Sequence, residues 1–128
     1  MIVDTSAVMA IVLEEPERDA MLRKLLESPV RRISAGTWME LATVIIRRHP
    51  AKSRLVEVLL RHLDLVIEDV TREQAQLGRD AYRAFGRGTR HPARLNFGDC
   101  FAYALSRATG EPLLFKGDDF ARTDVVAA

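Results

Sequence analysis

Short apolar runs alternate with longer amphipathic stretches along the chain. Four of these runs end in polar or turn residues after a few positions, and they predict strands because they are too short for helices. A fifth run, close to the end of the sequence, predicts one further short strand. In chain order the five runs are MIV, RRIS, DLVIEDV, PLLF and TDVVAA.

Longer stretches between these runs repeat their apolar residues at helical spacing. Pro16 is placed to open the first of them, Pro50 ends the second, and Thr71 forms a capping box with Gln74 in the fourth. The predicted helices are PERDAMLRKLLES, AGTWMELATVIIRRHP, SRLVEVLLRHL, TREQAQLGRDAYRAFG and NFGDCFAYALSRATG. The early stretch SAVMAIVL fits a helix or a strand by its periodicity.

Strands that alternate with helices predict an α/β fold, a three-layer α/β/α sandwich with a mainly parallel central sheet. The 128 residues are enough for one hydrophobic core, and no repeat, linker or low-complexity segment divides them. Residues 1–128 are therefore expected to form a single domain. In such sheets, ligands bind in the crevice beyond the carboxyl ends of the strands.

Composition excludes several classes of protein. The 19 Lys and Arg residues nearly balance the 18 Asp and Glu residues, so net charge indicates no particular partner. Arginine pairs such as Arg47 and Arg48 are most simply solvated helix faces. A single cysteine, Cys100, excludes a disulfide framework and a thiolate zinc site. No apolar run approaches the ~20 residues of a membrane span, so we expect no membrane segment, no signal peptide and a cytoplasmic protein.

Acidic residues lie where the predicted strands end. Asp4 follows the first strand, and Glu40 lies in the first turns of the helix after the second. Asp118 and Asp119 follow the fourth strand, while Asp99 opens the helix before it and joins the others only if that helix begins at the same edge. Converging carboxylates repel one another, and Mg²⁺ relieves this repulsion while it keeps several waters. Such a site supports hydrolysis of phosphate esters.

Each of these carboxylates also has a purely structural interpretation. Glu40 and Asp99 both complete the spacing of a capping box with a residue three positions earlier. Asp4 suits an N-cap, and Asp118 with Asp119 suits a turn. Spacing leaves both interpretations open, and the case for a site rests on the shared position of the acids beyond the strands.

Four segments carry these acids, and together they span essentially the whole chain. They are MIVDTSAVMAIVLEEPE, WMELATVI, LNFGDCFAYALS and PLLFKGDDFARTDV. None of these motifs is specific alone. In this order they resemble the PIN-domain nucleases, and among them the VapC-type toxins of bacterial toxin–antitoxin pairs. The resemblance implies a Mg²⁺- or Mn²⁺-dependent ribonuclease that a cognate antitoxin inhibits.

The resemblance also implies roles for particular residues. By position, Asp4 and Asp99 are the main metal ligands, and Glu40 and Asp119 hold metal-bound waters or a second ion. Supporting residues complete this implied site. A small hydroxyl, Thr5 or Ser6, holds Asp4 or a metal-bound water, and Asp118 is the near alternative to Asp119.

Basic residues must offset the field of these carboxylates, and RNA must be single-stranded or looped to reach them. The candidates for RNA binding are Arg87, Arg90 and Arg94 in the loop RGTRHPAR, together with Lys116. A solvated arginine-rich loop is the alternative interpretation. Trp38 suits either base stacking or the core, and its apolar helix face favours the core.

Partners follow from the same resemblance. An antitoxin segment is expected in an apolar groove, with an arginine that reaches the carboxylates. The helices from Val8 to Leu26 offer apolar surface for it, although core packing explains most of those residues. A homodimer is also implied.

Two competing functions remain open at this stage. Receiver domains and aspartate-nucleophile phosphatases also place carboxylates beyond parallel strands. The phosphatases need a second aspartate where this chain has Ser6, and a receiver needs its phosphoacceptor near Asp69 with a lysine such as Lys116. The other alternative is a non-enzymatic partner-binding module whose acids only cap helices.

Overall fold

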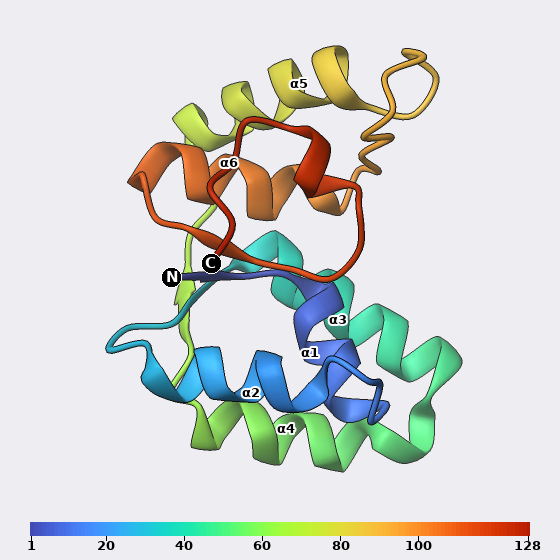
Figure 1. Ribbon diagram of the computed structural model, residues 1–128, viewed down its shortest axis with the longest axis vertical. Helices are drawn as coiled ribbons and strands as arrows, with labels where there is room; N and C mark the ends of the chain where they lie inside the picture. The colour runs from blue at the N-terminus through green and yellow to red at the C-terminus, as the bar shows by residue number, and fades with distance from the viewer.

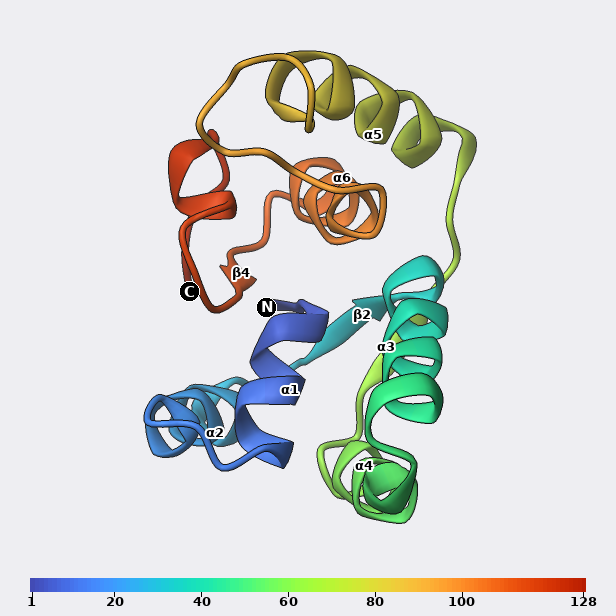
Figure 2. The same ribbon diagram turned by 90° about the vertical axis from the view of Figure 1, so that its right-hand side faces the viewer.

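The structure, a computed structural model, describes residues 1–128. Its core is a sheet of four parallel strands in the order β3-β2-β1-β4 (Figures 1 and 2). The strands are β1 Ile2–Val3, β2 Arg32–Ser34, β3 Val66–Glu68 and β4 Leu113–Leu114. The first four predicted strands and their parallel arrangement are therefore confirmed.

Six α-helices connect and flank the strands. They are α1 Thr5–Val12, α2 Arg18–Glu27, α3 Ala35–Arg48, α4 Ser53–His62, α5 Arg72–Phe85 and α6 Asp99–Thr109, with short 3₁₀ turns η1 Pro50–Lys52 and η2 Phe120–Arg122. The ambiguous stretch SAVMAIVL is helix α1, because Asp4 caps it directly after the strand. Helix α2 begins two residues after Pro16, and Thr71 caps α5 by accepting from the Gln74 N–H, as predicted.

The helices cover both faces of the sheet, which confirms the three-layer sandwich (Figure 2). Adjacent residues of a strand point to opposite faces, and β1 shows this directly. Val3 packs into one cluster with side chains of α1, α2, α3 and α4, while Ile2 packs into a second cluster with α6 and Ala81 of α5. No helix of the chain is long and apolar enough to cross a bilayer.

The predicted last strand, TDVVAA, is wrong. Only one isolated bridge joins this segment to the sheet, between Leu113 and Ala127. The start of this segment does not pair with β4. Tyr103 donates a hydrogen bond to Asp124 at 2.6 Å and holds that residue against α6. The chain therefore returns beside β4 at one residue pair instead of adding a strand.

The strand order places a ligand crevice between β1 and β4. The chain winds outward from β1 through β2 to β3, then crosses back to add β4 on the other side of β1. Loops diverge at such a switch point and leave a crevice at the carboxyl ends of the strands. Helix α6 leads directly into the parallel strand β4, so its N-terminus, with Asp99, lies at this same edge.

Candidate active site

Asp4 lies at the floor of this crevice and is only 3% exposed. Its Oδ2 atom accepts hydrogen bonds from the Ser6 N–H at 2.8 Å and from the Ser6 hydroxyl at 2.6 Å. The Ser6 Oγ in turn accepts from the Lys116 N–H at 2.9 Å, which ties the end of β4 to this carboxylate. The other oxygen, Asp4 Oδ1, is buried and has no hydrogen-bond partner. Asp4 is thus both the predicted N-cap and an acid with one oxygen left for a ligand.

Glu40 approaches the edge of this crevice from α3. Thr5 donates its hydroxyl to Glu40 Oε2 at 2.9 Å, so the two hydroxyls of the first motif serve different acids, Ser6 for Asp4 and Thr5 for Glu40. The capping-box interpretation of Glu40 is wrong, because α3 begins at Ala35 and its cap is Ser34. Glu40 lies beyond the first turn, where a carboxylate caps nothing.

Asp99 combines a structural bond with a place in the crevice. Its Oδ2 accepts from the Asn96 N–H at 2.7 Å, and the Asn96 side chain accepts from the Asp99 N–H at 3.0 Å. The expected capping box is therefore present. The side chain is 9% exposed, and its remaining oxygen has no protein donor. Capping and site function are compatible in this residue, as they are in Asp4.

A cavity of about 370 Å³ opens at this edge. Among its lining residues, Asp119 is present and Asp118 is absent, so the structure brings Asp119 to the crevice and leaves Asp118 on the exposed turn. Glu40 lies beside this cavity and lines an adjoining hollow, and Val44 lines both of them. The remaining lining residues are Asp4, Thr5, Ser6, Met9, Leu13, Arg48, His49, Asn96, Asp99, Lys116 and Phe120.

Burial and mutual repulsion disfavour negative charge in this crevice. Burial, above all, raises the pKa of Asp99 to about 7, with contributions from the charges of Asp4, Glu40 and Asp119. Burial likewise raises the pKa of Asp4, against the hydrogen bonds from Ser6, and raises that of Glu40, to which the charge of Asp4 adds. Three carboxyl groups with raised pKa values in one crevice are typical of a functional site.

These residues fit a hydrated divalent cation. The buried Asp4 Oδ1 has no partner and leaves a position for a donor or a cation. A cation would offset the burial and the repulsion that together raise the three pKa values. No three acidic, histidine or cysteine side chains are grouped so that they could hold a metal ion by themselves. A small hard cation needs only one or two carboxylates because it keeps several waters. The site therefore suits such an ion, with Asp4 and Asp99 as the candidate ligands.

The raised pKa of Asp99 predicts how stability depends on pH. The folded state holds this proton up to about pH 7 because the pKa is raised, whereas the unfolded chain releases it near the ordinary aspartate pKa of 3.8. The folded state therefore binds more protons in this window, and the Asp99 contribution to the free energy of unfolding decreases as pH rises through it.

A divalent cation should reverse that loss, since it binds the deprotonated carboxylates. We expect the increase in Tm on adding Mg²⁺ to EDTA-treated protein to be larger at about pH 8 than at about pH 5.5. Thermal unfolding at both pH values measures it. An Asp99→Asn variant should show a smaller pH dependence, and an equal dependence in that variant would contradict the assignment.

The predicted RNA-binding residues lie at different distances from the cavity. The Lys116 ammonium lines the cavity but forms ion pairs with Glu15 at 2.7 Å and Glu17 at 2.9 Å. The three loop arginines do not line the cavity. Sequence reasoning missed the basic end of α3, where Arg48 and His49 both line it. The signal was present, since the helix after β2 ends in two arginines, but a basic last turn is common for reasons of helix polarity alone.

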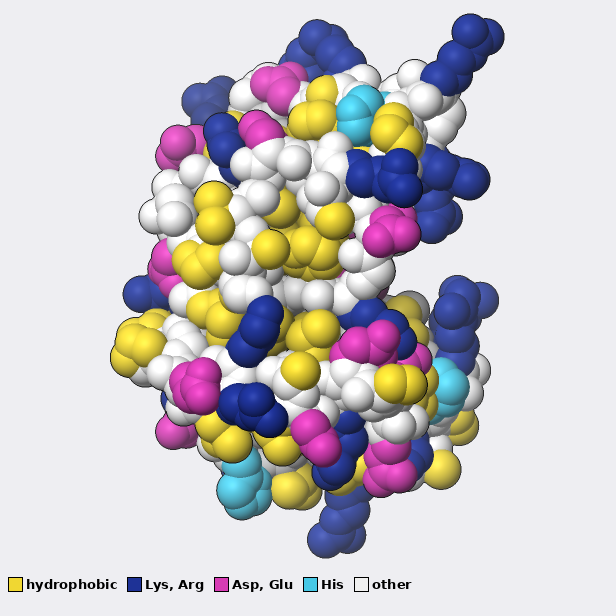
Figure 3. All heavy atoms as spheres, in the orientation of Figure 1, with side chains coloured by type: hydrophobic (Ala, Val, Ile, Leu, Met, Phe, Trp, Pro, Cys, Tyr) yellow, Lys and Arg dark blue, Asp and Glu magenta, His cyan; other side chains and the backbone are white.

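Arginines and lysines surround the crevice nonetheless. Figure 3 shows a hollow at the right-hand edge of the molecule, with Lys and Arg side chains above it, over the loop before α6, and below it, near the end of α3. Trp38 is partly buried against the cluster around α1 and α4, which confirms the core interpretation. Most of the apolar residues from Val8 to Leu26 are buried or packed against this cluster, and the exposed exceptions are Ala20 and Leu26, the latter at 64%.

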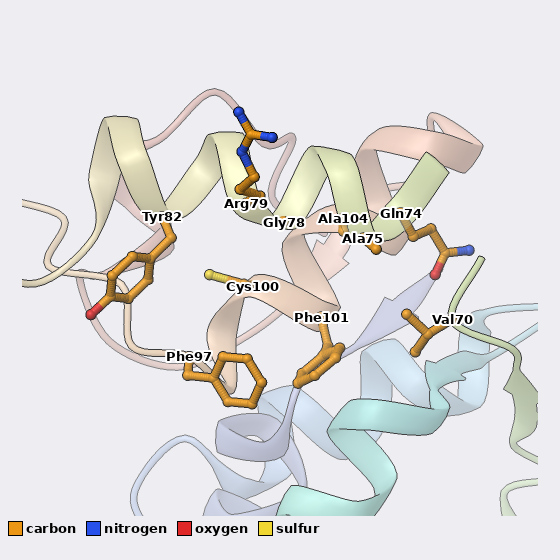
Figure 4. A pocket seen from close by; sticks show the side chains of 10 residues that line it. All are labelled: Val70, Gln74, Ala75, Gly78, Arg79, Tyr82, Phe97, Cys100, Phe101 and Ala104. Atoms are coloured by element: carbon orange, nitrogen blue, oxygen red, sulfur yellow. The ribbon is translucent and has the colours of Figure 1, made fainter. Parts of the chain in front are cut away.

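A second hollow lies between α5 and α6, with Val70 at one end and Tyr82 at the other (Figure 4). It has a volume of about 400 Å³ and mostly apolar walls. The Phe97 and Phe101 rings form one side of it and meet edge to face, 5.0 Å between centroids. Phe97 is 74% exposed, so this groove is open apolar surface rather than core.

Comparisons with known proteins agree with this fold. A family model described as PIN domain matches residues 1–126. Ribonuclease VapC42 of Mycobacterium tuberculosis is 49% identical over 126 residues, which cover 98% of this chain and 96% of that protein. Ribonuclease VapC of Mycolicibacterium smegmatis is 41% identical over 128 residues, which cover 99% and 98%.

Solved structures show the same fold. The crystal structure of VapC20 from Mycobacterium tuberculosis, described as a Sarcin-Ricin loop cleaving toxin, superposes with a TM-score of 0.73 at 22% identity and covers 99% of this chain and 97% of that one. A toxin–antitoxin complex from Klebsiella pneumoniae gives 0.72 at 18% identity, with 99% and 95% covered.

A parallel α/β sandwich with a carboxylate crevice at its switch point defines the class, and the chain belongs to the PIN-domain family. Its relatives at 49% and 41% identity place it among the VapC ribonucleases. The receiver, phosphatase and purely structural alternatives are therefore set aside.

Proposed function

We propose that this protein is an endoribonuclease toxin that hydrolyses phosphodiester bonds of RNA with Mg²⁺ held by Asp4 and Asp99. The observation that carries the proposal is the buried, unpartnered Oδ1 of Asp4 in a crevice shared with Asp99. Sequence similarity to ribonucleases over nearly the whole chain supports the choice of RNA. Mn²⁺ has the same ligand preference and is the alternative ion.

Within this proposal, the chain's own residues hold the acids in place. Ser6 fixes one oxygen of Asp4 and leaves the other facing the crevice, while Asn96 does the same for Asp99. Thr5 holds the Glu40 carboxylate in a position from which Glu40 can accept a proton from a water molecule or orient that water. A bound divalent cation would supply an activated water and stabilise negative charge on the phosphate. Asp119 completes the cluster from the exposed loop after β4.

Cleavage of RNA tests this proposal directly. We expect the purified protein to cut total cellular RNA at defined positions in Mg²⁺ and to stop in excess EDTA, with activity restored by added Mg²⁺. Mapping of the new RNA ends identifies the sites. RNA that stays uncut in Mg²⁺ and in Mn²⁺ with folded protein would sink the proposal, and cutting that persists in EDTA would remove the cation from it.

A cognate antitoxin and a second copy of the chain are the partners in the same proposal, which places the activity in the cytoplasm. The structural relative from Klebsiella pneumoniae is a toxin–antitoxin complex, which supports the first partner. Exposed apolar side chains support protein contacts in general, since Met39, Ile46 and Phe97 are each at least 67% exposed.

A further inference from the structure

The acidic crevice needs positive charge to admit RNA, and the structure limits where that charge can come from. Lys116 lies in the cavity wall, but its ammonium is held by Glu15 and Glu17, so its charge is already neutralised. Arg87, Arg90 and Arg94 lie outside the cavity. Among the arginines and lysines that line it, one remains, and that residue is Arg48.

Arg48 is placed and charged for this task. Its side chain is exposed and forms no ion pair and no hydrogen bond within the chain, and the residue ends the helix that also carries Glu40. An arginine that lines the same cavity as Asp4, Asp99 and Asp119 and pairs with none of them keeps all its donors for a ligand. The planar guanidinium binds phosphate oxygens through two parallel hydrogen bonds.

We propose that Arg48 binds a phosphate group of single-stranded RNA at the rim of the acidic cavity and so holds the strand over the carboxylates. This inference rests on the proposed ribonuclease function and adds to it a substrate-positioning residue. Arg48 offsets the repulsion between the RNA backbone and the carboxylates of the crevice. Its charge is available for this because, unlike that of Lys116, it is not paired with a carboxylate.

The competing explanation is that Arg48 only stabilises the end of α3. A cation in the last helical turn interacts favourably with the helix dipole. Arg47 lies in the same last turn and is also exposed, yet it does not line the cavity. An Arg47→Ala variant therefore loses the same charge at the same helix end and serves as a matched control.

Binding and cleavage are measured separately. Binding uses fluorescence anisotropy of a labelled single-stranded RNA with the Asp99→Asn protein, which does not cut it, and with Arg48→Ala or Arg47→Ala added to that background. We expect Arg48→Ala to weaken binding by about tenfold and to reduce the slope of log K against log salt by about 0.7. Arg47→Ala should stay within about twofold, and Arg48→Lys should lie between Arg48→Ala and the unchanged arginine.

The outcomes separate this inference from the proposed function. Equal RNA affinity for the Arg48→Ala and Arg47→Ala proteins overturns the role of Arg48, even if the wild-type protein cleaves RNA. A lower Tm in both variants with unchanged binding assigns both residues to the helix end instead. An Arg48→Ala protein that binds RNA normally but no longer associates with a co-expressed partner protein also overturns it. Failure of the wild type to cleave, with RNA binding that depends on Arg48, sinks only the nuclease function.

Discussion

An Asp99→Asn variant should lose RNA cleavage by about 10³-fold or more and still fold normally. The carboxylate charge is what a cation at this site requires, and asparagine removes it without changing the shape of the side chain. The amide oxygen can still accept from the Asn96 N–H, so the capping bond at 2.7 Å is kept. The variant also removes a charge that the crevice disfavours, so its Tm at about pH 8 in EDTA should equal or exceed that of the wild type.

Cleavage of a fluorescent RNA substrate and thermal unfolding measure the two parts of this prediction. Asp118→Asn provides the matched control, because Asp118 neighbours the crevice residue Asp119 on the same exposed turn but does not line the cavity. That control should retain at least about half of the activity. Full cleavage by the Asp99→Asn protein, or cleavage equally lost in the Asp118→Asn protein, would contradict the assignment of the site.

Gly98→Ala should lower activity by about 10²-fold without destabilising the fold. A β-carbon at this position would overlap the Glu40 carboxylate. The Gly98 backbone is helical, with φ −62° and ψ −42°, so alanine fits the main chain and should be neutral or slightly stabilising there. The flexible Glu40 side chain must then move and give up its bond from Thr5.

A double-mutant cycle tests whether the loss acts through Glu40. Steady-state cleavage is measured for Gly98→Ala, Glu40→Gln and the combination of the two. If alanine acts by displacing the carboxylate, the double variant should be no slower than Glu40→Gln alone. Multiplying losses would show that Gly98 acts by some other route, and a large drop in the Tm of Gly98→Ala would indicate a general packing defect.

The strands, helices and layers could be predicted from sequence because local signals agreed with the tertiary context. Buried apolar runs and capping residues such as Thr71 mark their elements without knowledge of neighbours. The segment TDVVAA misled for the same reason, since its apolar residues resemble a strand. Its contacts to α6 through Asp124, which no local pattern reveals, limit it to a single bridge.

The candidate site divides along similar lines. Asp4 and Asp119 could be placed because they follow strands, and a parallel sheet collects such residues at one edge. The pairing of Lys116 with two glutamates from the turn between α1 and α2 could not be foreseen, because it joins positions about a hundred residues apart. Arg48 was missed because a helix end explains its charge equally well, and only the three-dimensional cavity separates it from Arg47.

The hydrogen bond from the Lys116 N–H to Ser6 Oγ has a consequence for the order of events during translation. Ribosomes release the N-terminal residues first, so Asp4 and Ser6 emerge long before β4 and Lys116. Until β4 pairs beside β1, Ser6 lacks one of its anchors, and Asp99 and Asp119 are not yet beside Asp4. A nascent chain therefore carries its acids as separate, unassembled groups. It becomes a competent nuclease only after β4 and Asp119 have been made.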